Sequence, residues 1–342
     1  MTSENNVNYI DVARGIGIVL VVLGHCISKQ MAEESMLLNV LRIVIYVVHM
    51  PVFFVISGWL FEKNTAKYKK SSITIYTKKK FAVFFIPYLI FSACTYLVIW
   101  SCINFFPSVG SILVQQGYQF NGFTQVIKEV LIYQNHQDGH LWFCYVMFLV
   151  LLINRVLIDH KEPYLIALFG VATICVLYYS PYLPELLFRT VKYTFLFMVG
   201  RLLYGYQFKR TSCVSLIVSL ASISLYVVLQ LKEMRFARLI VLPVAEISSA
   251  ISIIFVISKS LDNSAVGRFF KYFGTGRVSY AIYLVHMPFI TSSLVFLMTK
   301  AKIIPDIVVV LSSATLAMLI SIIVFKLLSC SKLIRKLCFG MN

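Results

Sequence analysis

Charged side chains are scarce in this chain of 342 residues. Asp, Glu, Lys and Arg make up only 13% of it, about half the share that soluble domains carry. Hydrophobic residues make up 59%, and the mean hydropathy is +0.84. A soluble domain is therefore excluded, and the composition predicts an all-α polytopic membrane protein. The net charge of +17 does not indicate nucleic-acid binding, because most Lys and Arg residues lie between apolar segments and orient the chain in the membrane.

The sequence also lacks the short motifs of several enzyme classes. It has no C-x-x-C pair, and its eight cysteines lie in, beside or after apolar segments, so neither a redox pair nor a zinc site is indicated. The absence of a G-x-S-x-G turn argues against a Ser-His-Asp esterase. His136 and His140 have the spacing of helical zinc ligands, but Gly139 and the sequence NHQDG argue against a continuous helix there. We expect no metal site.

Ten apolar segments are long enough, or nearly so, to cross a bilayer as helices. They occupy residues 10–28, 37–61, 81–103, 140–158, 163–180, 187–207, 212–231, 238–257, 278–298 and 306–328. Every second connection between these segments is rich in basic residues, and together these connections hold 18 Lys and Arg residues, more than the opposite set. Basic connections tend to be cytoplasmic, and the most basic one is KYKKSSITIYTKKK at 67–80. Both termini are therefore predicted to be cytoplasmic. Residues 104–139 form the longest outward connection, a candidate lid or acceptor-binding loop.

The first span, DVARGIGIVLVVLGH, carries three ionisable side chains. Asp11 and Arg14 rule out a cleavable signal peptide by interrupting its apolar run. On a helix, Asp11, Arg14 and His25 share one stripe, with about 16 Å between Arg14 and His25. The plainer alternative is that Asp11 and Arg14 extend to the lipid headgroups, but this leaves His25, three turns deeper, unexplained.

Other spans add polar side chains that we expect to converge inside the bundle. The candidate substrate-binding residues are His49, Ser57, His140, Trp142, Glu246, Tyr283 and His286, with Arg42 and Ser279 on the same helices. Glu246 has an equally good reading as the structural partner of a membrane arginine.

The sequence IYVVHMP at 45–51 recurs as IYLVHMP at 282–288. An inverted repeat of the transporter kind has to be considered, but the flanking residues disagree and favour independent constraint. In both copies a proline two residues after a histidine predicts a kink with a polar lining.

These motifs resemble those of the acyltransferase-3 family, membrane O-acyltransferases that modify bacterial surface glycans and other hydroxylated acceptors. Asp11, Arg14 and His25 match its first-helix pattern, and HMPVFFVISGWLF at 49–61 resembles its second-helix signature. HLWF at 140–143 and SYAIYLVHMPF at 279–289 are similar to two later ones. The resemblance covers essentially the whole chain, which we expect to be a single transmembrane domain, 1–342, without a fused extracytoplasmic domain.

The resemblance implies a functional pair, His25 and Arg14, with acyl-CoA as the donor. The basic residues that follow the second helix, often arginines in the family, correspond to Lys78, Lys79 and Lys80, so these lysines are the candidate CoA contacts. Asp11 is expected to pair with Arg14. Whether His25 acts as a general base or is itself acylated stays open.

The resulting hypothesis is transfer of an acetyl group from cytoplasmic acetyl-CoA to a hydroxyl of a glycan or polyprenyl-linked sugar at the outer face of the bacterial inner membrane. The expected partners are the donor, the acceptor, membrane lipid and a second copy of the chain, with no nucleic acid. The alternative is a secondary transporter of an organic anion, although a carrier needs neither the lysine-rich loop nor the Arg14–His25 spacing.

Overall fold

The computed structural model describes residues 8–341 except 116, 134–136, 161, 207–211 and 301–303, and contains no strand among them. Its α-helices are α1 (Asn8–Cys26), α2 (Lys29–Glu34), α3 (Met36–Lys63), α4 (Thr65–Lys69), α5 (Ile73–Lys80), α6 (Ile86–Phe105), α7 (Pro107–Gln115), α8 (Phe123–Ile132), α9 (Trp142–Val156), α10 (Pro163–Tyr178), α11 (Glu185–Leu203), α12 (Ser212–Leu231), α13 (Arg235–Ile251), α14 (Ser258–Leu261), α15 (Ala265–Gly274), α16 (Gly276–Val285), α17 (Phe289–Lys300), α18 (Asp306–Leu328) and α19 (Lys332–Phe339). Two π-helical stretches, η1 (Phe81–Phe85) and η4 (Ser252–Ile257), and two 3-10 turns, η2 (Gly139–Leu141) and η3 (Ser180–Tyr182), connect them.

Seven helical segments of the described chain are long and apolar enough to cross a membrane. They are Tyr9–Cys26, Met36–Lys63, Ile73–Phe105, Gly139–Val156, Val214–Leu231, Arg235–Leu261 and Asp306–Leu328. The pair α16 and α17 makes an eighth if it counts as one span, bent by 60°. Of the remaining expected spans, α10 has only 16 residues and α11 carries four charged residues. A multi-pass helical membrane protein is thus confirmed, whereas ten spans and cytoplasmic termini stay predictions.

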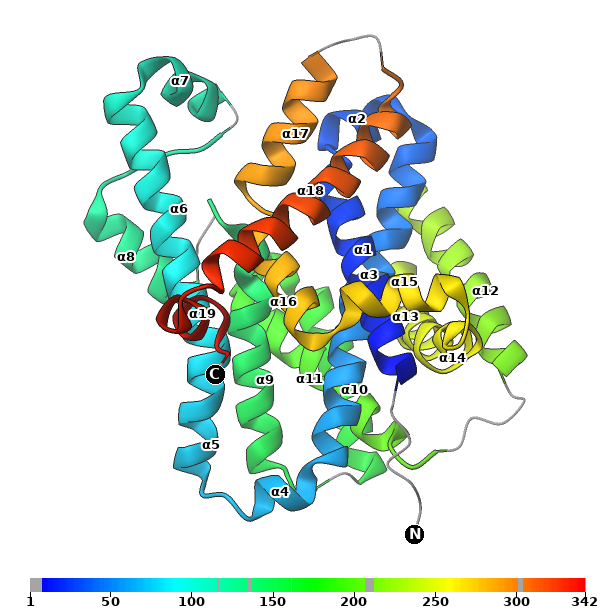
Figure 1. The fold of residues 1–342 in the computed structure, drawn as a ribbon. Coiled ribbons are helices and arrows are strands. Elements are labelled where there is room, and N and C mark those ends of the chain that lie inside the picture. The colour runs from blue at the N-terminus through cyan, green and yellow to red at the C-terminus, as the bar shows by residue number, and fades with distance from the viewer. Residues whose placement is uncertain are drawn as a thin grey trace.

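Helix α1 lies inside the bundle, where it contacts α3, α15, α16 and α18, and α15 runs across it (Figure 1). The crossing depends on two glycines. A Cβ atom on Gly15 would lie 1.9 Å from the carbonyl oxygen of Phe270, and one on Gly274 would lie 1.6 Å from that of Asp11. The two backbones therefore touch beside Asp11 and Arg14, an approach that only residues without a side chain allow.

Arg201 joins three helices at the opposite end of the bundle from His25. Its side chain is buried and donates hydrogen bonds of 2.9–3.2 Å to the carbonyls of Leu157, Ile158 and His160, just beyond the end of α9. It also donates to Glu62 at the end of α3, at 3.1 Å. Carbonyls at a helix end have no partner within the helix, so this arginine satisfies them and fixes α3 and α9 against α11.

The repeated HMP sequence has two different structures. In α3 the helix continues through Pro51, whereas the second copy separates α16 from α17 directly after His286. The predicted kink is therefore confirmed at 282–288. In α3 the helix passes through Pro51 without a break.

Candidate functional site

The predicted ion pair between Asp11 and Arg14, one turn apart near the start of α1, is present. The Arg14 guanidinium lies 2.8 Å from the Asp11 carboxylate, and both side chains are partly exposed. Arg14 lines a cavity of about 290 Å³, here called the Arg14 cavity. The guanidinium therefore faces an interior space rather than lipid headgroups.

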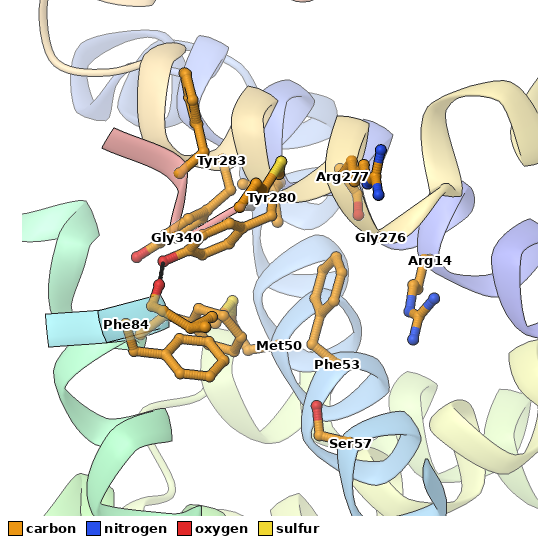
Figure 2. Close-up of a pocket in the computed structure, with 16 residues that line it drawn as sticks. Arg14, Met50, Phe53, Ser57, Phe84, Gly276, Arg277, Tyr280, Tyr283 and Gly340 are labelled. Carbon is orange, nitrogen blue, oxygen red and sulfur yellow. Dashed lines mark hydrogen bonds between the residues drawn. The ribbon is translucent and has the colours of Figure 1, made fainter. Parts of the chain in front are cut away.

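The Arg14 cavity has a basic side and an apolar side. Figure 2 shows Arg14 and Arg277 on one side of the cavity and the rings of Phe84 and Tyr280 on the other. Residues of α3 and α16, together with Phe143 and residues 339–341, complete the lining. The predicted site residues Ser57 and Tyr283 are among them, beside Met50, Phe53 and Ser279. The Tyr280 hydroxyl donates a 2.7 Å hydrogen bond to the carbonyl of Val83, which joins α16 to η1 along this wall (Figure 2). The cavity suits a long, mostly apolar ligand with an anionic end.

Three of the predicted histidines come together. The ring centroids of His25 and His286 are 5.3 Å apart, and those of His286 and His140 are 5.4 Å apart. These three residues, here called the histidine cluster, come from α1, the end of α16 and η2, so three distant segments build it. His25 is half-buried, whereas His140 and His286 are buried.

Hydrogen bonds fix the tautomer of His286. Its Nδ1 lies 2.9 Å from the carbonyl oxygens of both Ile282 and Tyr283, and since carbonyls only accept, Nδ1 carries the proton. Nε2 is then a free base, and no described group is bonded to it. His286 thus presents an unprotonated nitrogen inside the bundle.

Asp138 stands at the end of the histidine row. One of its carboxylate oxygens lies 2.8 Å from Nδ1 of His140, and the other accepts a 2.8 Å hydrogen bond from Thr95. At this distance the two atoms form an ion-pair contact whose angle does not suit a hydrogen bond. A carboxylate next to Nδ1 orients an imidazole and leaves Nε2 as its basic nitrogen.

A second cavity reaches the cluster from the other end of α1. It has a volume of about 1060 Å³ and is here called the His25 cavity. His25 and Ser292 line it together with Gln115 and Tyr118 of the long 104–139 connection. Burial raises the pKa of Tyr118, so its phenol stays neutral and offers a hydrogen bond.

The histidine cluster lies between the two cavities. His25 lines one of them, and Tyr283, which lines the other, donates a 2.5 Å hydrogen bond to the carbonyl of His140. Arg14 and His25 are separated along α1 by about 16 Å, so they serve opposite ends of this arrangement.

Other predicted site residues lie further away. His49 donates to the carbonyl of Ile45 at 2.6 Å and packs 5.2 Å from the ring of Tyr46, which separates it from His25. Trp142 is stacked on Tyr193 and lies under the guanidinium of Arg189, and its role in substrate binding stays a prediction.

Glu246 forms a buried ion pair of 2.6 Å with Lys192, so its structural partner is a lysine rather than an arginine. Lys78 and Lys79 are exposed on α5, and the Lys80 ammonium lies over the rings of Tyr68 and Tyr76. None of these three lysines lines the Arg14 cavity.

Sequence reasoning missed Asp138, Arg277 and Lys192. Asp138 lies within the loop-like sequence NHQDG, which carries no catalytic signature, and Arg277 lies in a basic connection whose charge alone predicts only orientation in the membrane. Within the described residues, no three His, Cys, Asp or Glu side chains are grouped as metal ligands, and His136 lies outside those residues.

Comparison with known proteins identifies the family. A family model described as an acyltransferase domain, Acyl_transf_3, matches residues 7–326. Neither a curated protein nor a solved structure matches the chain. The family match spans nearly the whole chain and includes all four motifs and the histidine cluster. This multi-pass membrane protein therefore belongs to the acyltransferase-3 family.

Proposed function

We propose that the protein transfers an acetyl group from acetyl-CoA in the Arg14 cavity to a hydroxyl of a surface glycan or lipid-linked sugar in the His25 cavity. The observation that carries the proposal is the position of the histidine cluster between two cavities that approach it from opposite ends of α1. Membrane acyl transfer is the activity of the family. The donor, the acceptor and the bacterial inner membrane are the proposed details.

The donor fits the Arg14 cavity by chemistry. Arg14 and Arg277 offer planar guanidinium groups to a phosphate or a carbonyl, and the apolar wall accommodates a flexible pantetheine arm. Lys80 precedes Val83 of this wall by three residues, so the anionic nucleotide end lies over Lys78, Lys79 and Lys80 as it leaves the cavity.

His25 acts on the acceptor hydroxyl. It removes the hydroxyl proton while the oxygen attacks the thioester carbonyl; a C–O bond forms, the C–S bond breaks, and the proton passes to the departing thiolate. His286 and His140 extend this proton path, and Asp138 orients its far end. The acceptor reaches His25 through the His25 cavity, which Tyr118 and Ser292 also line.

The test compares His25→Ala with His160→Ala in purified full-length protein reconstituted in liposomes. His160 is an exposed loop histidine that pairs with Glu162 and lines neither cavity. Loss of general base catalysis predicts CoA release at least about 100-fold slower for His25→Ala and unchanged for His160→Ala. Mass spectrometry of surface glycans from cells with each variant identifies the acceptor.

Normal CoA release and glycan acetylation by a membrane-inserted His25→Ala protein would sink the assignment. If the protein moves an organic anion across the liposome membrane but releases no CoA, the alternative function, a secondary transporter of an organic anion, is correct instead.

A further inference from the structure

A third cavity lies beside the histidine cluster and has no role in the mechanism above. It has a volume of about 330 Å³, is lined by residues of α3, α11, α12 and α13, and is here called the Arg42 cavity. Its polar lining comprises Asn39, Arg42, Tyr46, Lys192, Gln230 and Glu246. So many polar groups facing one space within a membrane bundle indicate a ligand rather than lipid.

The Arg42 cavity carries an excess of positive charge. Lys192 and Glu246 neutralise each other through their 2.6 Å ion pair. Arg42 forms no ion pair within the described part of the chain, and its guanidinium lies over the ring of Tyr46, 5.5 Å from the centroid. Arg238 lines a neighbouring cavity and donates a hydrogen bond to Gln230, so it adds no charge to the lining of this one. A cation left without an acid in a lined cavity favours an oxyanion as its partner.

Tyr46 connects this cavity to the reacting centre. It lines the Arg42 cavity, and its ring centroid is 6.3 Å from that of His25. A ligand in the cavity is therefore separated from His25 by a single aromatic ring.

The location of Arg42 also needs an explanation. Arg42 lies in the half of α3 that is predicted to face outward. A basic residue there works against the charge bias that orients membrane helices. Its position is explained if it binds a ligand.

We propose that the Arg42 cavity is the subsite for an oxyanion, a sugar carboxylate or phosphate, carried by the acceptor. The acceptor is then an acidic glycan unit or a sugar phosphate rather than a neutral sugar. The identification of the ligand as the acceptor rests on the function proposed above, whereas the presence of an oxyanion site does not depend on it.

The experiment measures binding without any acyl donor. Full-length protein in phosphatidylcholine nanodiscs is titrated with glucuronate, glucose 1-phosphate, glucose and inorganic phosphate, and the thermal midpoint gives each dissociation constant. At least one of the two acidic sugars binds more tightly than glucose and inorganic phosphate, and the better one identifies the oxyanion. Loss of a charge-assisted hydrogen bond in Arg42→Gln weakens that binding by about tenfold or more.

Two further variants make the result specific. Arg42→Lys, which keeps the charge, retains part of the binding and shows that the fold tolerates substitution here. Lys232→Gln removes an exposed cation from the same end of the bundle and leaves binding unchanged.

Equal binding of glucose, or of inorganic phosphate, overturns the sugar-oxyanion subsite, as does binding that Arg42→Gln does not weaken. Competition by phosphatidylglycerol in the nanodisc assigns the cavity to a lipid headgroup and also overturns it. Because no donor is present, these outcomes are independent of CoA release, so failure of the acyltransferase assignment is recognised separately.

Discussion

The position of the Arg14 side chain decides whether it anchors α1 at the lipid headgroups or binds a ligand inside the bundle. An arginine that only anchors a helix extends toward the headgroups, free of the bundle. Here the guanidinium is held by Asp11 at 2.8 Å and faces a cavity that it shares with Arg277 (Figure 2). The arrangement is that of a ligand-binding group with a fixed orientation.

Arg14→Lys is therefore expected to impair acetylation strongly although it conserves the charge. Lysine lacks the planar fork that holds Asp11 and a ligand oxygen together, and the loss of one such bond corresponds to about tenfold or more in rate. The measurement compares acetylation rates at matched membrane levels. Arg235→Lys is the control, since Arg235 is exposed and donates only to the carbonyl of Tyr178. A fully active Arg14→Lys protein would return Arg14 to the anchoring role.

Much of the residue-level site was predictable, and the reason is local. Asp11, Arg14 and His25 share a helix, so helical periodicity alone places them on one stripe. His140 and His286 were expected in the interior because ionisable side chains in apolar spans seldom face lipid. Asp138 escaped prediction because its role depends on Thr95 and on a histidine whose ring orientation only the tertiary structure defines.

At the scale of elements, the site depends on how closely α1 approaches α15. Gly15 and Gly274 bring the two backbones into contact, and this contact sets the position of Asp11 and Arg14 relative to Arg277 on the following helix. The apolar spans could be read from hydropathy. This crossing could not, because a glycine in a sequence does not identify the backbone that it faces.

Gly274→Ala is expected to weaken donor binding. The added Cβ atom would lie 1.6 Å from the carbonyl oxygen of Asp11, so α15 must move away from α1, an overpacking that typically costs about 1–3 kcal/mol. The KM for acetyl-CoA should rise while the acceptor KM stays unchanged. In the control Gly170→Ala, the nearest atom is 3.2 Å away on the mobile ring of Phe195. A Gly274→Ala enzyme with the wild-type donor KM would show that the crossing does not position the donor site.

The two HMP sequences show where prediction at this scale fails. In each copy the histidine Nδ1 bonds to the carbonyl four residues earlier, as nearly identical local sequence suggests. Only the second copy ends its helix. Nearly identical local sequence therefore does not decide whether the helix ends.

For the whole molecule, orientation in the membrane decides which cavity receives which substrate. The basic connections predict that the Arg14 cavity opens to the cytoplasm and the His25 cavity to the outside. The sequence predicted the orientation from charge counts but not the cavities, since these depend on how many helices pack together.

Cysteine labelling tests this orientation. An impermeant maleimide is expected to label Gln125→Cys in right-side-out vesicles and Thr74→Cys in inverted ones, both being exposed positions outside the apolar core. The parent protein, with its native cysteines, gives the background. The reversed pattern would place the lysine-rich segment outside and contradict the proposed direction of transfer.

The position of the histidine cluster between two separate cavities has an electrical consequence. Under the proposed function, the acyl carbon exchanges its bond to sulfur for a bond to oxygen beside His25, while the hydroxyl proton passes in the opposite direction, to the sulfur. The acyl group leaves the sulfur without the bonding electrons, so its outward transfer counts as the movement of one positive charge. The proton moves inward and also carries one positive charge, so a turnover carries no net charge across the bilayer. The membrane potential, worth about 2.3 kcal/mol per elementary charge at 100 mV, therefore neither drives nor opposes the reaction. The thioester alone supplies the driving force, and transfer proceeds equally well across a de-energised membrane.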